Sequence, residues 1–224
     1  MAEPSVSKRA SVFLVDDHPL VRESLTSLIN QQSDLFACGE AEDAATSLRE
    51  IARIEPDVAI IDLSLKSGSG MDLIRSVKAR TPNVAMIVLS MHDEKIYAER
   101  AIRAGARGYV MKRESTKRII AAIRHVLQGR LALSEQMAAG FAERFVGSRH
   151  PAGESPLEGL SDRELEVFTL LGRGLETRRI AETLNVSIKT VQAYCARIKQ
   201  KRNLSTAAEL LREAIRWNEQ QGDN

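Results

Sequence analysis

Short apolar runs alternate with amphipathic stretches from Ser11 to about Gln128. The apolar runs have the length and β-branched composition of buried strands, and the stretches between them repeat apolar residues at helical spacing. Strands that are apolar on both faces belong in a parallel sheet covered by helices. The pattern therefore predicts a doubly wound α/β domain with a five-stranded parallel sheet, over residues 1–128. Its strands are expected at 12–15, 35–40, 58–61, 84–89 and 108–111, and its helices at 19–29, 43–54, 71–80, 94–104 and 115–128.

The pattern changes after this domain. Residues 129–156 contain one helical stretch, 134–145, and then a turn-forming run poor in apolar residues, which is typical of a linker. From residue 157 to 221 only helical signals occur, and the first begins with a capping box formed by Ser161 and Glu164. A small all-α domain is predicted there, with helices at 161–171, 177–184, 187–201 and 206–217.

Polar residues stand where the predicted strands end. Asp16 and Asp17 follow the first strand, Asp62 follows the third, Ser90 ends the fourth and Lys112 ends the fifth. Carboxyl ends of parallel strands share one edge, so these side chains are expected to lie together. Converging carboxylates repel one another unless a cation compensates them, and an oxygen-only ligand set suits Mg²⁺. The sequence therefore predicts a magnesium site suited to phosphoryl transfer.

This set of residues resembles the receiver domain of bacterial two-component response regulators. The resemblance implies that Asp62 accepts a phosphoryl group from the phosphohistidine of a sensor histidine kinase. It also implies direct Mg²⁺ ligation by Asp17, Asp62 and the backbone carbonyl of Ser64, with Asp16 acting mainly through water. Lys112 and Ser90 would bind phosphoryl oxygens, and Tyr109 would turn inward as the Ser90 hydroxyl moves. Lys66 and Arg113 depart from the family, which commonly has proline at both positions.

The stretch 187–201 has two unlike faces on a helical wheel. Val191, Cys195 and Ile198 form an apolar stripe, so we interpret Cys195 as a core residue. The opposite face carries small, amide and basic side chains, which can approach base edges, and a flank offers groups for phosphates. The helix expected at 177–184, the tight turn after it and this second helix together predict a helix-turn-helix. The expected DNA-contacting residues are Lys189, Thr190, Gln192, Ala193, Tyr194, Ala196, Arg197, Lys199 and Lys201.

Residues 160–217 also resemble the LuxR-type DNA-binding domain of the NarL/FixJ response regulators, through the segments 160–167, 180–187 and 189–191. By this resemblance Gln192, Ala193 and Ala196 are the base-reading positions. Tyr194 and Cys195 depart from the residues usual in the family. Arg202 falls on the core stripe of the wheel, where it must snorkel or change the local packing.

Composition adds limits to this interpretation. The 32 Lys and Arg residues against 30 Asp and Glu residues give a net charge of +2, which by itself argues against nucleic-acid binding. The average hides a local excess, because residues 173–202 hold eight basic and two acidic side chains. Two distant cysteines favour a reducing compartment, and we find neither a signal peptide nor a membrane-spanning run. A cytoplasmic protein with no membrane contact is expected.

Together these features predict a phosphorylation-switched, DNA-binding transcriptional regulator, whose only catalysis is the Mg²⁺-dependent phosphorylation of its own Asp62. The resemblance implies a homodimer when phosphorylated, through the face of the fourth helix, fifth strand and fifth helix. The alternative is a regulator with the same folds that protein partners control without phosphorylation. An aspartyl-phosphate phosphohydrolase fits less well, because it needs a second aspartate where Ser64 stands. A protein-interaction module without a DNA role is a further alternative.

Overall fold

The structure is a computed structural model that describes residues 9–65, 67–146, 157 and 159–222. The chain forms two compact units, residues 1–146 and 147–224. The departure at Lys66 and the turn-forming run 147–156 lie outside the described residues. Among the residues described, no helix combines the length and the apolar character needed to cross a membrane.

The first unit is built on one parallel sheet, as the apolar runs predicted. Its strand order is β2-β1-β3-β4-β5, and every neighbouring pair is parallel. β3 is buried along its whole length, which fits a strand covered on both faces. The strands are β1 (Ala10–Val15), β2 (Leu35–Ala41), β3 (Val58–Ile61), β4 (Ala85–Ser90) and β5 (Gly108–Met111).

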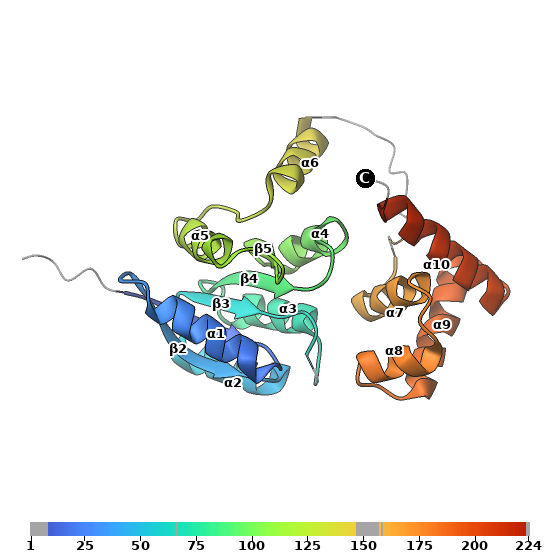
Figure 1. The fold of residues 1–224 in the computed structure, drawn as a ribbon, viewed down its shortest axis with the longest axis horizontal. Helices are drawn as coiled ribbons and strands as arrows, with labels where there is room; N and C mark the ends of the chain where they lie inside the picture. Colours follow the sequence, from blue (N-terminus) through green and yellow to red (C-terminus); the bar gives the residue numbers. More distant parts are fainter. Residues whose placement is uncertain (1–8, 66, 147–156, 158, 223–224) are drawn as a thin grey trace, which may run out of the picture. The chain divides into compact units, whose positions relative to one another are not determined.

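Helices cover both faces of this sheet (Figure 1). Helices α1 (Pro19–Asn30) and α5 (Thr116–Leu127) pack Leu25, Ile29 and Ile123 into the main apolar core on one face. Helices α2 (Ala44–Ile54), α3 (Gly70–Arg80) and α4 (Glu94–Ala104) follow one another on the other face. The predicted doubly wound α/β fold is confirmed.

One more helix, α6 (Glu135–Val146), belongs to the first unit. It is the helix expected within the linker, and it packs near α4 (Figure 1). Met137 of α6 is buried, and the amide of Ser134, just before the helix, donates a 3.0 Å hydrogen bond to the Glu94 carboxylate of α4. These contacts attach the start of α6 to the sheet domain.

The second unit consists of four helices in its described part: α7 (Asp162–Gly172), α8 (Thr177–Thr183), α9 (Ile188–Arg202) and α10 (Ala207–Gly222). The predicted capping box is present, because the Ser161 hydroxyl accepts from the Glu164 amide and the Glu164 carboxylate accepts from the Ser161 amide. Phe168 of α7 and Trp217 of α10 meet in the core, with ring centroids 6.0 Å apart. The all-α second domain is confirmed.

Candidate phosphoacceptor site and DNA-binding helix

The strand ends bring the predicted acidic residues together in the first unit. Asp16 and Asp17 follow β1, and Asp62 follows β3, which is the next strand in the sheet. All three carboxylates are buried, with 2%, 7% and 3% of their residue surfaces exposed. Buried carboxylates need compensation by a cation or by hydrogen-bond donors, since burial disfavours the charged form.

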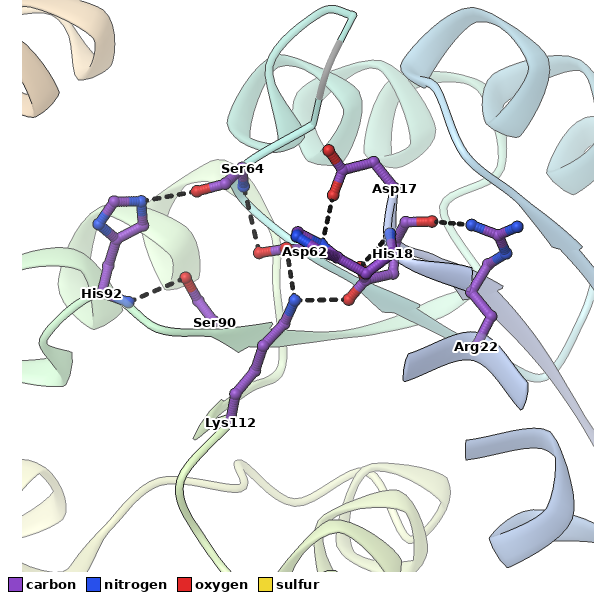
Figure 2. Close-up of polar contacts among 9 residues, drawn as sticks. Asp17, His18, Arg22, Asp62, Ser64, Ser90, His92 and Lys112 are labelled. Carbon is purple, nitrogen blue, oxygen red and sulfur yellow. Dashed lines mark hydrogen bonds and ion pairs between the residues drawn. The ribbon is translucent and has the colours of Figure 1, made fainter. Parts of the chain in front are cut away.

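The compensating charge comes from the end of β5. The Lys112 ammonium lies 2.6 Å from Asp16 Oδ2 and 2.7 Å from Asp62 Oδ2, so it bridges the two carboxylates (Figure 2). The amide of Ser64 donates to the other oxygen of Asp62 at 3.1 Å. Asp62 is therefore held by donors on both oxygens.

Burial and charge act in opposite directions on this pair. Burial raises the pKa of Asp62 to about 6, although the Lys112 ammonium pulls it down. Burial alone would lower the pKa of Lys112, but the carboxylates of Asp62 and Asp16 outweigh that effect and raise it. Lys112 therefore stays charged at neutral pH, and most Asp62 carboxylates remain ionised there.

Sequence reasoning gave no role to three residues at this site, which are His18, Arg22 and His92. His18 Nδ1 lies 3.1 Å from Asp16 Oδ1 and 2.7 Å from Asp17 Oδ1, which places its ring beside the acidic cluster (Figure 2). Arg22, one helical turn further on, donates from Nη1 to the Asp16 carbonyl at 2.7 Å and pairs through Nε with Glu40 at 3.0 Å. The position of His18 directly after Asp17 was the available signal, and Arg22 lies on the same face of α1.

Ser90 and Tyr109 are joined through the residue that links β4 to α4. The Ser90 hydroxyl accepts from the His92 amide at 3.2 Å, and the Tyr109 hydroxyl donates to the His92 carbonyl at 2.9 Å. Tyr109 points inward and is fully buried, and burial raises the pKa of its hydroxyl well above the ordinary value. The His92 ring forms a 2.9 Å hydrogen bond with the Ser64 hydroxyl, so the loop after β4 contacts the loop after β3, which carries Asp62.

The site offers the ligand set that a cation needs. Ligand atoms of Asp16, Asp17, His18 and Asp62 all lie within 4.8 Å of one another. Oδ1 of Asp17 is buried and accepts no hydrogen bond, and its neighbour is the His18 Nδ1 atom at 2.7 Å. A buried carboxylate oxygen that accepts no hydrogen bond fits a hard cation, and Mg²⁺ takes one or two carboxylates together with waters.

In the second unit, α9 presents the two faces that the helical wheel predicted. Val191 and Ile198 are buried, and Cys195 is half-buried, which supports its interpretation as a packing residue. The Ser187 hydroxyl caps the helix by accepting from the Thr190 amide at 3.1 Å. The opposite face is exposed at Lys189, Gln192, Ala193, Ala196 and Arg197.

Side chains beside that face differ in their freedom to meet DNA. The Arg197 guanidinium lies 5.6 Å from the centre of the half-buried Tyr194 ring, and Lys199 is half-buried. Lys201 is engaged inside the unit, because its ammonium lies 2.7 Å from the buried Glu164 carboxylate and 2.9 Å from the Gly159 carbonyl. Arg202, which was expected to snorkel or to change the local packing, is half-buried and pairs with Glu213 of α10 at 2.7 Å.

Comparison with known proteins agrees with both units. Residues 12–124 match the family of response regulator receiver domains, and residues 158–214 match the luxR family of bacterial regulatory proteins. The chain belongs to the two-component response regulators that carry a LuxR-type helix-turn-helix DNA-binding domain, as its motifs indicated. It is a DNA-binding transcription regulator, in keeping with that family.

Several relatives match along nearly the whole chain. Oxygen regulatory protein NreC of Staphylococcus carnosus is 32% identical over 209 residues, which cover 92% of this chain and 96% of the relative. The crystal structure of a LuxR-family two-component response regulator from Aurantimonas sp. SI85-9A1 is 33% identical and covers 62% of this chain and 100% of that chain, with a TM-score of 0.57. RcsB from Salmonella enterica serovar Typhimurium, bound to promoter P1flhDC with the phosphomimetic BeF₃⁻, shares the fold at 24% identity. It covers 92% of this chain and 98% of its own, with a TM-score of 0.61.

Proposed function

We propose that Asp62 accepts a phosphoryl group from the phosphohistidine of a sensor histidine kinase, and that this switches the DNA binding of the chain. The observation that carries the proposal is the Lys112 ammonium held between Asp16 and Asp62, in a buried acidic site. In the transfer, an Asp62 oxygen forms the new bond to phosphorus while the bond from phosphorus to the donor imidazole breaks. The electron pair of that bond goes to the imidazole nitrogen.

The residues of the site divide the remaining work. Asp17, Asp62 and the Ser64 carbonyl would hold Mg²⁺, with Asp16 acting mainly through water. The bound cation supplies neutralisation of charge on the phosphoryl oxygens. The Lys112 ammonium lies 2.7 Å from Asp62 Oδ2. When Asp62 becomes phosphorylated, this ammonium can move from the carboxylate to a phosphoryl oxygen and pair with it. Positioning and charge neutralisation of this kind are the main sources of catalysis in phosphoryl transfer.

Ser90 and Tyr109 form the proposed switch. The Ser90 hydroxyl is placed to bind another phosphoryl oxygen. Tyr109 is coupled to Ser90 because both hydroxyl groups bond the backbone of His92. Phosphorylation then shifts a two-state equilibrium of the first unit and favours a homodimer.

The proposed DNA contacts lie on α9. Gln192, Ala193 and Ala196 face the base edges of double-stranded DNA, with Lys189 nearby. Thr190, Tyr194, Arg197 and Lys199 meet phosphates along the flank. Lys201 was expected among them, but its ion pair with Glu164 favours a role in stability. Two alanines read at most thymine methyl groups, so phosphate contacts and DNA shape carry much of the affinity.

The test is labelling with a small acyl phosphate in the presence of Mg²⁺. Wild type should form an acid-stable, alkali-labile acyl phosphate, and Asp62→Ala should form none. Asp72→Asn is the matched control, because Asp72 is an exposed partner of Arg75 in the same unit and should leave labelling unchanged. Labelling that survives Asp62→Ala would refute the assignment. Absence of labelling in wild type would favour a regulator controlled by protein partners alone.

A further inference from the structure

The chain does not leave the sheet where α5 ends. Ala132 forms a parallel bridge with Gly108 of β5, the strand at the edge of the sheet. Its amide donates to the Arg107 carbonyl at 2.9 Å, and its carbonyl accepts from the Tyr109 amide at 2.9 Å. Residues 131–134, which we call the edge strap, therefore lie along the open side of β5 before α6 begins.

Side chains from both flanking helices hold the edge strap in place. Arg118 of α5 donates to the Leu133 carbonyl, and Glu94 of α4 accepts from the Ser134 amide at 3.0 Å. Glu94 is 9% exposed, so a buried carboxylate is committed to this contact. Such an interaction costs the desolvation of a charge and is stabilising only while its donor stays in place.

Gly108 fits the close approach of the two segments. A Cβ at this position would lie 3.0 Å from the Ala132 Cβ and 3.2 Å from the Ala132 carbonyl oxygen. Both distances are tighter than ordinary packing, so a side chain here would press on the strap. The sequence of β5 thus leaves room for residue 132.

Two of the residues that hold the strap are connected to the phosphoacceptor site. Tyr109, whose amide bonds Ala132, bonds the His92 carbonyl with its hydroxyl. Glu94 follows His92 by two residues at the start of α4. The His92 amide in turn donates to the Ser90 hydroxyl. These contacts therefore form a continuous path from Ser90 to both attachments of the strap.

We infer that the edge of β5 is a switchable interaction surface whose occupant is the chain's own edge strap, and that phosphorylation of Asp62 loosens it. The loosened strap changes the anchoring of α6, and through the connecting chain this changes the DNA affinity of the second unit. While the strap is docked, the same edge of β5 is closed to a second copy of the chain. This inference rests on the proposed phosphorylation of Asp62.

Hydrogen exchange on the full-length chain tests the first step. Mg²⁺ with beryllofluoride serves as the phosphoryl mimic, and Val88 in the buried strand β4 is the internal reference. The amides of Ala132 and Ser134 should lose protection by at least about 5-fold when the mimic binds, whereas Val88 keeps its protection. Unchanged exchange at both strap amides, in protein whose Asp62 is labelled by acyl phosphate, would overturn the inference and leave the proposed function standing.

Variants test the second step. Ala132→Pro removes the amide that donates to Arg107, and Glu94→Ala removes the acceptor of the Ser134 amide. Glu99→Ala is the matched control, because Glu99 lies on the same helix and its carboxylate pairs with Arg103. A DNA duplex is first selected from a random-sequence pool by its binding to the wild-type protein. The affinity of each variant for this duplex is then measured with and without beryllofluoride.

We expect the mimic to change wild-type affinity by about 5- to 150-fold, the usual range of allosteric coupling. The ratio of DNA affinity with beryllofluoride to DNA affinity without it should fall to within about 2-fold of unity in both strap variants. The control should keep the wild-type ratio. Labelling of Asp62 in each variant shows that the site is folded. Wild-type ratios in both labelled strap variants would overturn the inference. A wild-type chain that is not labelled at all would overturn the proposed function and this inference with it.

Discussion

Lys201→Met should destabilise the second unit, although sequence patterning placed Lys201 among the DNA contacts. Its ammonium lies 2.7 Å from Glu164 Oε2, and the two side chains are 41% and 3% exposed. Breaking a fully buried pair costs about 3–5 kcal/mol and an exposed pair contributes about 0–1 kcal/mol. With one partner buried and one half-exposed, we expect a loss of about 2 kcal/mol, between those limits. For a domain of this size that lowers Tm by about 8–16 °C.

The single tryptophan makes the assay specific for the second unit. Trp217 is buried against Phe168, so its fluorescence follows the unfolding of that unit alone. Lys189→Met is the matched control, because it removes an exposed lysine from the same helix and should leave Tm unchanged. If Lys201→Met melts at the temperature of the control, the assignment of Lys201 to stability is refuted.

The acid dependence of the same pair gives an independent check. Burial alone would raise the pKa of Glu164, but Lys201 and the Ser161 amide outweigh it and hold the pKa below its ordinary 4.5. A lowered pKa in the folded state contributes stability above pH 4.5, and this stability is lost as the pH falls through the folded pKa. Glu164→Gln keeps the capping function but not the charge, so its stability deficit should shrink below pH 4.5. A deficit of equal size at pH 7 and pH 4 would contradict the argument.

Three further outcomes follow from the sites. Ser90→Ala should keep acyl-phosphate labelling of Asp62 but lose most of the change in DNA affinity that labelling produces in wild type. Lys189→Ala and Arg197→Ala should each reduce the slope of log affinity against log salt by about 0.9, as expected for one phosphate contact, and an unchanged slope would remove the residue from the interface. Gly70→Ala should lower the free energy of unfolding of the first unit, measured in urea, by about 4–5 kcal/mol, which is the upper range for point substitutions. The reason is that its Cβ would lie 2.2 Å from the Asp62 carbonyl oxygen.

The strand-end residues were predictable because a parallel sheet leaves few arrangements for them. Asp17, Asp62 and Lys112 follow β1, β3 and β5, and the carboxyl ends of parallel strands share one edge of the sheet, so the topology brings them together. The contacts of His18 and Arg22 were not predictable, since they depend on side-chain rotamers that a helical or strand period does not specify. The capping box of Ser161 and Glu164 was predictable because it joins residues three apart in one turn.

The edge strap left no comparable signal in the sequence. A one-residue bridge at Ala132 has no periodicity, and the residues around it resemble a loop in composition. Its supports come from Glu94, 40 positions away, and from Arg118, 15 positions away. Only the assembled sheet brings these groups together, so the boundary between domain and linker could not be placed from patterning alone.

Charge counting shows the same limit in the second unit. Eight basic residues in 173–202 predicted a positive surface, yet four of them are paired with carboxylates of their own unit. Arg178 and Arg179 meet Glu182, Lys201 meets Glu164 and Arg202 meets Glu213. Each of these pairs cancels local charge that would otherwise attract phosphates. Of the other four basic residues, Lys189, Arg197 and Lys199 lie on α9, where we propose the DNA contacts, and Arg173 lies at the end of α7. The position of each lysine and arginine is therefore more informative than their number.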